Sequence, residues 1–348
     1  MKIALIGLGS VGQGFLDLVM DKAADLHTRY GLQIQLVAVA TGSNGTLVNP
    51  DGLDLNTLRA ALTSGHKPAL AAYAGEAVRD WDALRIARES NADVLIEASP
   101  SNLKTGQPAL DLCYAALNSG KHLILANKGP LAVDYVGLKA CAEAAGTLLR
   151  FEATVMAGTP TLHLGMQALA GATLTEVRGI LNGTTNYILT QMEGGLAYAE
   201  ALQQAQALGY AEADPAGDVD GWDAAGKLLI LAAALFDRRL TFDDLDVSGI
   251  TAITPADIES ARANGERYKL IARLTRDGGE VRAVRLPLSD PLANVSGATN
   301  AITLRTDVLG EVTLIGAGAG RRETGFALLA DLLDIHRLTR AEDAVVRG

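Results

Sequence analysis

An acidic segment that ends in a lysine carries the residue types used in general acid–base chemistry. Between Gly209 and Lys227 the chain holds five carboxylates within twelve residues, among them Glu212, Asp218 and Asp223. Their spacing does not match a calcium loop, in which ligands alternate along the chain and a glutamate closes the series. Asp223 and Lys227 are four residues apart, acid first, so a helix would place them on one face.

Two interpretations of this acid–lysine pair follow from its surroundings. An exposed pair of this kind would stabilise a helix by only about 0.2–0.5 kcal/mol. The helix expected over Trp222–Phe236 is apolar nearly all round, however, which is typical of a buried helix. Charges on a buried helix are costly unless they face a cavity. We therefore favour a functional role for Lys227.

A second lysine, Lys128, follows the expected strand His122–Ala126. Open α/β sheets bind their ligands at the carboxyl ends of the strands, which is where this lysine would lie. An ordinary solvated loop lysine would occupy the same position. The position alone does not separate these two interpretations.

A glycine-rich loop lies between the apolar run Ile3–Ile6 and a helical pattern. The G-x-G-x-x-G spacing lets the backbone turn tightly and approach a pyrophosphate, which the amides of the following helix can bind. The spacing alone is a weak signal, but its position between a strand and a helix predicts a dinucleotide site. The candidate cofactor residues in this loop are Gly7, Gly9, Ser10, Val11 and Gly12.

The choice between NAD and NADP depends on the end of the second expected strand, Leu36–Ala40. An acid at that point would bind the 2′-hydroxyl of the NAD ribose, but the chain has Thr41 there. The absence of an acid removes repulsion toward a 2′-phosphate. No arginine stands in the loop Thr41–Gly45 to bind one. The pattern favours NADP over NAD only slightly, so NAD stays an alternative cofactor.

The elements that must position these residues alternate between strand and helix in the first part of the chain. This alternation predicts an α/β fold, a Rossmann-type doubly wound parallel sheet. Beyond Pro130 the pattern changes to that of a second, α+β domain, with strands expected at Leu148–Val155 and Glu176–Leu181 and a helix at Thr161–Leu169. Only 28 residues follow Gly320, so the chain is expected to return to the first domain with its last helix. We expect a dinucleotide-binding domain at residues 1–130, a substrate-binding domain at 131–310, and the return at 311–348.

Composition limits the classes of partner. The chain has 348 residues, a net charge of −10 and 49% hydrophobic residues, which is a globular profile that argues against a nucleic-acid or anionic-membrane surface. No membrane span or signal peptide is expected. The two cysteines, Cys113 and Cys141, form no disulfide framework. We expect a soluble, reduced, cytoplasmic protein of the size of an enzyme.

Taken together, the motifs resemble the homoserine dehydrogenase family. The resemblance covers the chain from Met1 to about Ile335 and rests on several segments in the family's order. They are the glycine loop, Ala98-Ser99-Pro100-Ser101-Asn102, Ala126-Asn127-Lys128-Gly129-Pro130, Glu152–Pro160, Gly179–Leu189 and Gly209–Lys227.

The resemblance implies NAD(P)-dependent interconversion of L-aspartate 4-semialdehyde and L-homoserine, on the route to threonine, isoleucine and methionine. Lys227 would be the proton donor, and Lys128 would help to bind the cofactor or polarise the reacting oxygen. Glu212, Asp218 and Asp223 would bind the substrate. The resemblance also assigns Ser99, Gly209 and Gly318 to the cofactor.

The family further implies a monovalent cation, usually sodium, and an assembly. Glu152 and the carbonyls of Val155, Ala157 and Thr159 would hold the cation. A homodimer or dimer-based tetramer would form through the sheet of the second domain. The chain has no room for the C-terminal ACT domain or the N-terminal aspartate kinase of many members, so we expect a monofunctional form.

Two alternatives have different chemistry. A related semialdehyde dehydrogenase would share the nucleotide fold but acylate a cysteine, and neither cysteine here has the flanking pattern. A non-catalytic NAD(P) sensor would need only the glycine loop. The acidic segment with Lys227 favours an enzyme over a sensor.

Overall fold

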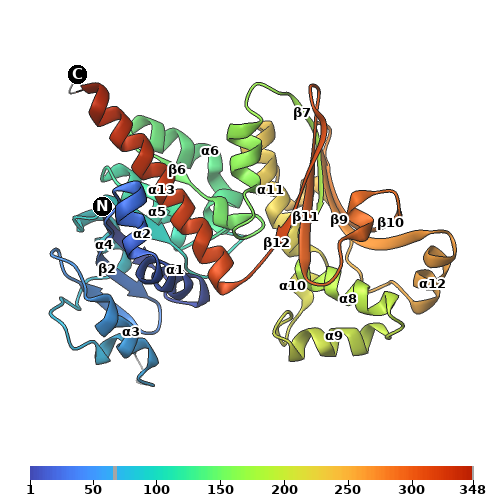
Figure 1. Ribbon diagram of the computed structural model, residues 1–348, viewed down its shortest axis with the longest axis horizontal. Helices are drawn as coiled ribbons and strands as arrows, with labels where there is room; N and C mark the ends of the chain where they lie inside the picture. Colours follow the sequence, from blue (N-terminus) through green and yellow to red (C-terminus); the bar gives the residue numbers. More distant parts are fainter. Residues whose placement is uncertain (66–68, 347–348) are drawn as a thin grey trace. The chain divides into compact units, whose positions relative to one another are not determined.

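Short apolar strands build the first sheet. In the computed structural model, which describes residues 1–65 and 69–346, these strands pair in the order β3-β2-β1-β4-β5-β6 (Figure 1). Every neighbouring pair is parallel except β2 with β3. This is the doubly wound α/β sheet predicted from the sequence. The strands are β1 (Lys2–Ile6), β2 (Gln35–Thr41), β3 (Gly45–Val48), β4 (Val94–Glu97), β5 (His122–Leu125) and β6 (Leu149–Arg150).

The order of these strands creates a switch point between β1 and β4. The chain runs from β1 outward to β2 on one side and then crosses to β4 on the other side. The loops after β1 and β4 diverge at such a point, and the crevice at their carboxyl ends is where doubly wound sheets bind ligands. The helices of this region are α1 (Ser10–Asp21), α2 (Ala23–Tyr30), α3 (Leu55–Thr63), α4 (Ala83–Glu89), α5 (Ala109–Asn118) and α6 (Gly129–Ala144).

The last helix, α13 (Arg321–Val346), packs along α1 (Figure 1). Two glycines allow the close approach. A Cβ on Gly14 would lie 2.1 Å from the carbonyl oxygen of Arg321, and one on Gly325 would lie 2.5 Å from the amide of Phe15. The Arg321 guanidinium also pairs with Asp17 at 2.6 Å. The contact therefore joins the two ends of the chain through backbone as well as side chains.

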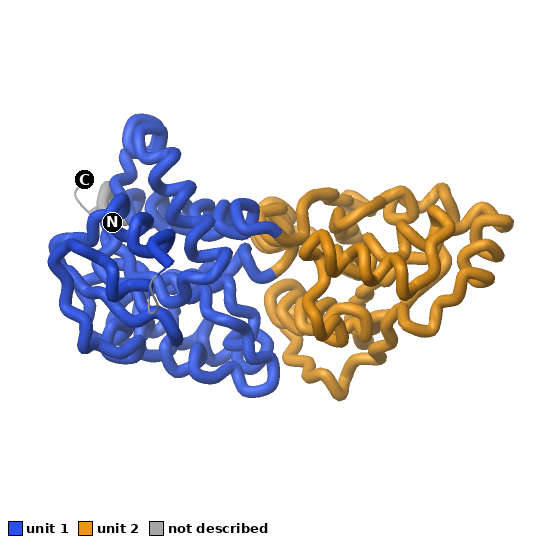
Figure 2. The backbone as a smooth tube through the Cα atoms, turned by 90° about the horizontal axis from the view of Figure 1, so that it is seen from below, with its two compact units in different colours: residues 1–154, 320–348 blue, residues 155–319 orange. Residues whose placement is uncertain are grey.

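The chain divides into two compact units (Figure 2). The first comprises Met1–Thr154 and Gly320–Gly348, and the second comprises Val155–Ala319. Residues 131–154, which the sequence analysis placed in the second domain, thus lie in the first unit. The reason is β6, which follows α6 and pairs with β5 in the first sheet through Leu123↔Leu149 and Ile124↔Arg150. The return likewise begins at Gly320, not at residue 311.

Two elements of this region differ from the prediction. The strand expected over Leu148–Val155 is confined to Leu149–Arg150, because the backbone then turns into a short 3₁₀ segment, Glu152–Thr154. The Glu152 amide donates to the Asp331 carboxylate at 2.9 Å instead of to a neighbouring strand. The helix expected over Thr161–Leu169 is present over Thr161–Ala168, but it changes after one turn from α7 (Thr161–His163) to a wider π-helix (Leu164–Ala168).

The second unit contains a six-stranded sheet with the order β12-β11-β7-β9-β10-β8. All neighbours are antiparallel except β10 with β8. Its strands are β7 (Leu174–Ile180), β8 (Leu245–Val247), β9 (Glu266–Thr275), β10 (Gly279–Pro287), β11 (Thr299–Thr306) and β12 (Gly310–Ala317). Its helices after β7 are α8 (Gly183–Glu193), α9 (Tyr198–Ala207), the short α10 (Ala216–Val219), α11 (Trp222–Phe236) and α12 (Pro255–Ala263).

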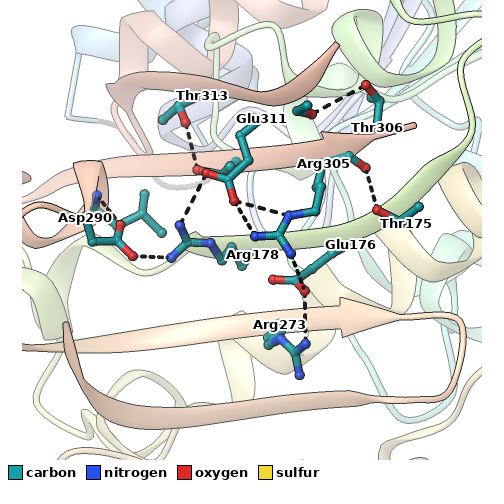
Figure 3. A network of polar contacts seen from close by, with 12 residues as sticks. Thr175, Glu176, Arg178, Arg273, Asp290, Arg305, Thr306, Glu311 and Thr313 are labelled. Carbon is teal, nitrogen blue, oxygen red and sulfur yellow. Dashed lines mark hydrogen bonds and ion pairs between the residues drawn. The ribbon is translucent and has the colours of Figure 1, made fainter. Parts of the chain in front are cut away.

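The two faces of this second sheet differ in polarity. Val177, Leu274 and Leu304 are fully buried on the face against which α11 packs. The opposite face carries a network of ion pairs across β7, β9, β11 and β12 (Figure 3). Glu176 lies in this network between the guanidiniums of Arg273, at 2.9 Å, and Arg305, at 3.9 Å. The remaining members are Arg178, Asp290 and Glu311.

Within residues 1–65 and 69–346, no helix combines the length and the apolar character needed to cross a membrane.

Candidate active site

A buried ammonium group lies at the start of α11. Lys227 extends from this almost wholly apolar helix, and its side chain is 9% exposed. Its Nζ donates to Oδ2 of Asp223 at 2.7 Å and to the carbonyl oxygen of Leu181 at 2.5 Å. The i,i+4 spacing brings the acid and the lysine together, and Leu181, the residue directly after β7, supplies the carbonyl. Two acceptors therefore fix the position of the lysine.

Asn182 joins the acidic residues into one cluster. Its side-chain amide donates to Asp218 at 2.7 Å and to Asp223 at 3.0 Å, while its Oδ1 caps α8 by accepting from the Thr185 amide at 2.9 Å. Asn182 is buried. The sequence analysis did not single it out, although an asparagine directly before a helix is a common cap. One residue thus orients both aspartates beside Lys227.

Asp218 is the carboxylate of this cluster with the most perturbed environment. Burial raises the pKa of its carboxyl above the usual value, the charge of Asp223 adds to this rise, and the hydrogen bond from Asn182 opposes it. An acid whose pKa is higher in the folded chain than in the unfolded chain favours folding at low pH. That contribution is lost as the pH rises through the folded-state pKa.

We expect Asp218→Asn to raise the melting temperature at pH 8, because the substitution removes a charge that burial disfavours and keeps the acceptor for Asn182. The gain should shrink as the pH is lowered toward 3, below the ordinary pKa of 3.8, where Asp218 is largely protonated in both states. Thermal unfolding of the variant and the original chain across this range measures the effect. A constant difference at every pH would contradict the assignment.

Two other predicted residues lie outside this cluster. Glu212 is exposed, and within the described part of the chain no hydrogen bond or ion pair joins its carboxylate to Asp218, Asp223 or Lys227. Its backbone carbonyl accepts from Gln206 at 3.1 Å. Gly209 ends the turn after α9 with φ of +76°, a conformation that favours glycine. The conformation of this turn is therefore a sufficient reason for a glycine at position 209, and no ligand is needed to explain it.

The glycine loop of the first unit has the shape needed for a dinucleotide. A Cβ on Gly7 would lie 2.4 Å from the carbonyl oxygen of Ala98, and one on Gly12 would lie 2.1 Å from that of Gly7. A Cβ on Gly9 would meet nothing within 4 Å, so the loop is open on that side. Gly9 is also the N-cap of α1 and provides no capping side chain. The amides of Ser10 and Val11 at the start of this helix therefore suit a phosphate.

The loops after β4 and β5 are held together by side chains. The Asn127 amide donates to Oγ of Ser99 at 3.2 Å and to the Pro100 carbonyl at 3.3 Å. The Lys128 backbone amide donates to Oγ of Ser101 at 2.9 Å. Beneath them lies Glu97, fully buried, which accepts from the Ser99 amide at 3.1 Å. Burial raises the pKa of the Glu97 carboxyl. These contacts fix Ser99 and Lys128 at the carboxyl edge of the first sheet.

The residues predicted to hold a cation lie on a tightly turned segment. Val155, Ala157 and Thr159 belong to the second unit, and Glu152 is a buried residue of the first. Met156 and Ala157 have φ of +59° and +49°, an uncommon conformation for residues with side chains that costs about 1–3 kcal/mol each. Among the described residues, no group of three or more histidine, cysteine or acidic side chains could hold a metal.

Gly318 packs against a buried asparagine. A Cβ at this position would lie 2.0 Å from Cγ of Asn300. Asn300 is itself fully buried, and neither polar atom of its side chain has a hydrogen-bond partner in the described structure. Close packing is therefore one reason for a glycine here.

Comparison with known families shows to which family the chain belongs. Residues 7–152 match the family model described as the NAD binding domain of homoserine dehydrogenase, and residues 160–333, half of the chain, match the model described as homoserine dehydrogenase.

The chain belongs to the homoserine dehydrogenase family.

Curated relatives of this homoserine dehydrogenase are similar along almost the whole chain. The NAD(+)-dependent homoserine dehydrogenase of Pseudomonas canavaninivorans is 44% identical over 343 residues, which cover 97% of this chain and 96% of the relative. The homoserine dehydrogenase of Methanocaldococcus jannaschii is 38% identical over 341 residues, covering 98% and 100%. The chain is thus an NAD(P)-dependent oxidoreductase.

Solved homoserine dehydrogenases share its fold. The structure from Thiobacillus denitrificans is 32% identical, has a TM-score of 0.82 and covers 98% of this chain and 74% of that chain. A hyperthermophilic archaeal homoserine dehydrogenase in complex with NADPH is 26% identical, with a TM-score of 0.82 and coverage of 96% and 97%.

The cysteines of this homoserine dehydrogenase do not suit acyl transfer. Cys113 is buried in α5, and burial raises the pKa of its thiol well above the usual value, which keeps it protonated and unreactive. Cys141 is partly buried in α6, and burial raises its pKa as well.

Proposed function

We propose that this homoserine dehydrogenase uses Lys227 as the group that exchanges a proton with the substrate oxygen. The observation that carries the proposal is the position of Nζ, held by Asp223 and the Leu181 carbonyl on a buried helix. The two acceptors hold Nζ in one position, which is what a residue that exchanges a proton with a substrate requires. We further propose that Glu212, Asp218 and Asp223 bind the ammonium and hydroxyl ends of L-homoserine.

The proposed reaction follows from this placement. A nicotinamide cofactor, when bound at the glycine loop, would supply the hydride for the aldehyde carbon of L-aspartate 4-semialdehyde. Negative charge then develops on the aldehyde oxygen, and Lys227 donates a proton from Nζ to that oxygen, which yields the alcohol. In the oxidative direction, neutral Lys227 accepts the hydroxyl proton. Asp223 orients Nζ throughout, and solvent restores the protonation state of the lysine afterwards.

The first unit would hold the cofactor. We assign its pyrophosphate to the amides at the start of α1, after Gly7, Gly9 and Gly12. Ser99 and Lys128 would lie along the same edge, where Lys128 helps to bind the cofactor or polarise the reacting oxygen. Gly209 and Gly318 stay candidates for further cofactor contacts.

A steady-state assay tests this function. The purified chain is given L-homoserine with NAD or NADP, and formation of the reduced cofactor is followed by absorbance. Turnover that depends on homoserine supports the proposal. Cofactor binding without turnover would indicate the sensor alternative and overturn it.

We expect neither cofactor to be preferred by more than about tenfold in kcat/KM. The loop 41–45 holds no charged residue, and Thr41 binds the Asn44 amide at 2.6 Å. A neutral hydrogen bond contributes about 0.5–1.5 kcal/mol, which is at most about tenfold. Thr41→Asp should lower the use of NADP by more than this and spare NAD, while Thr41→Ser should change neither. A strong preference in the original chain would contradict this.

A monovalent cation is proposed for the segment after Glu152. Carboxylate and carbonyl oxygens are the ligands that hard cations prefer, and the left-handed backbone at Met156 and Ala157 turns successive carbonyls in this segment. The Glu152 carboxylate and the carbonyls of Val155, Ala157 and Thr159 would hold sodium. Substrate binding measured after sodium is replaced by a bulky organic cation would show whether that binding requires the sodium ion.

The assembly is proposed to be a homodimer or dimer-based tetramer formed through the open face of the second sheet. That face carries the ion-pair network, and near its edge Ile315 is 57% exposed. Sedimentation at micromolar concentration should give twice or four times the chain mass, and Ile315→Glu should shift it toward the monomer. A monomer in the original chain would contradict this assembly.

We place the enzyme in the cytoplasm, on the route from aspartate to threonine, isoleucine and methionine. Its two cysteines are free thiols, which suits a reducing compartment.

A further inference from the structure

A buried carboxylate ends one of the central strands of the first sheet. Glu97 is the last residue of β4 and is fully buried, whereas the other residues of this strand, Val94–Ile96, are apolar. It is aligned with Ile6 of β1 on one side and with Leu125 of β5 on the other. Glu97 therefore lies at the carboxyl edge of the sheet, beside the switch point between β1 and β4.

The protein compensates the Glu97 carboxylate only in part. Oε1 accepts from the Ser99 amide at 3.1 Å, but Oε2 has no hydrogen-bond partner in the described structure. Burial raises the pKa of this carboxyl, and the donors of Ser99 and Asn127 oppose the rise without cancelling it. The titratable group that faces Glu97 from α5 is the buried thiol of Cys113, which is not a cation. A buried charge without a countercharge is costly.

The segment that Glu97 holds adjoins the glycine loop. The Ser99 amide, which donates to Glu97, would lie 2.7 Å from a Cβ on Gly7. The hydroxyl of Ser99 in turn accepts from Asn127 at 3.2 Å. The buried carboxylate therefore lies next to the loops after β1, β4 and β5, all of which end at the edge where a doubly wound sheet binds its ligand.

The position of Glu97 along this edge indicates which part of a cofactor it would adjoin. A sheet of this type has two halves, each of which binds one mononucleotide of a dinucleotide. Strands β1 and β2 form the half for adenosine, because the residue that meets its ribose follows β2. Strands β4 and β5 belong to the other half, which would receive the nicotinamide. This ring is positively charged in the oxidised cofactor and neutral in the reduced cofactor.

We propose, on the basis of the proposed function, that the Glu97 carboxylate strengthens binding of the oxidised nicotinamide cofactor relative to the reduced cofactor. The positive ring supplies the countercharge that the protein lacks, and salt screens a buried pair of charges only weakly. The neutral ring of the reduced form gains no such attraction. Among the bound states, the equilibrium therefore lies further toward oxidised cofactor and L-homoserine than it would without this charge.

Calorimetric titration of the full chain tests the proposal, with NAD⁺ and NADH, and NADP⁺ and NADPH, as two redox pairs. The measured quantity is the Kd of the oxidised form divided by the Kd of the reduced form. Glu97→Gln removes the charge but keeps an acceptor for the Ser99 amide. It should raise this ratio about tenfold, the size expected for one partly screened unit charge. ADP-ribose, which lacks the nicotinamide ring, should bind the variant and the original chain alike.

Two further variants separate charge from structure. Glu97→Asp keeps the charge on a shorter side chain, so the ratio should stay close to that of the original chain even if both forms bind more weakly. Glu89→Gln is the matched control, because it makes the same chemical change at the exposed last residue of α4. It should leave the ratio unchanged. Denaturant unfolding of each variant shows that it is folded.

The original chain provides a measurement that needs no variant. As the pH is lowered from 8 toward 4.5, the ordinary pKa of a glutamate, Glu97 becomes protonated and the ratio should rise. Cys113 stays protonated over this range and contributes no charge. A ratio that is constant with pH, or that Glu97→Gln leaves unchanged, would overturn this proposal and leave the proposed function intact. If neither redox pair binds the original chain, both are overturned.

Discussion

Lys227→Ala should lower kcat for homoserine oxidation by about 10²- to 10⁴-fold, the usual contribution of a positioned acid or base. The substitution removes the Nζ that Asp223 and the Leu181 carbonyl hold in place. Cofactor affinity should stay nearly unchanged, because the glycine loop belongs to the other unit. Stopped-flow and steady-state absorbance, together with a cofactor titration by fluorescence, measure both quantities.

Lys227→Arg separates proton exchange from charge. Arginine keeps the positive charge but stays protonated at any pH the protein tolerates, so it should be nearly as inactive as alanine. Lys139→Ala, which changes an exposed lysine of α6, is the matched control and should turn over normally. Near-normal turnover in Lys227→Ala would end the assignment of this lysine.

Asn182→Ala should lower kcat/KM by about 10- to 100-fold, which corresponds to the loss of a hydrogen bond to a charged group, about 1.5–3 kcal/mol. Without its amide, Asp218 and Asp223 lose the donor that holds both beside Lys227. Stability should also fall by about 0.5–2 kcal/mol, because α8 loses its cap. Kinetics and denaturant unfolding measure the two effects separately.

Asn182→Ser distinguishes positioning from capping. Serine is a good N-cap but is too short to reach both aspartates. It should therefore restore most of the stability and leave kcat/KM low. Recovery of activity along with stability would show that Asn182 acts only through the helix.

The parts of the site that could be predicted from sequence depend on local spacing. The glycine loop is contiguous, and Asp223 with Lys227 follows from the period of a single helix. Asn182 was missed because its partners are 36 and 41 residues away, and no local pattern encodes that contact. Glu212, which is close to the aspartates in sequence, forms no hydrogen bond or ion pair with them in the described structure.

The end of one strand was predicted wrongly for a similar reason. The run Leu148–Val155 has the apolar character of one strand, but the backbone leaves the sheet after Arg150 because Asp331 binds the Glu152 amide. That partner is 179 residues away. The boundary between the two units also lies later in the chain than predicted. Because β6 pairs within the first sheet, residues 131–154 belong to the first unit. An element with a local signal, such as α11, matches its predicted range, Trp222–Phe236.

The packing of α13 on α1 also constrains how the chain is made. Helix α1 leaves the ribosome early, but its partner is translated about 300 residues later, which takes roughly 15–60 s at about 5–20 residues per second. Throughout this interval the apolar residues Phe15, Leu18 and Val19 lack part of their final cover. The second unit, in contrast, is continuous in sequence and can fold as soon as it emerges. The nascent chain therefore completes its inserted unit before the unit that contains its own first residue.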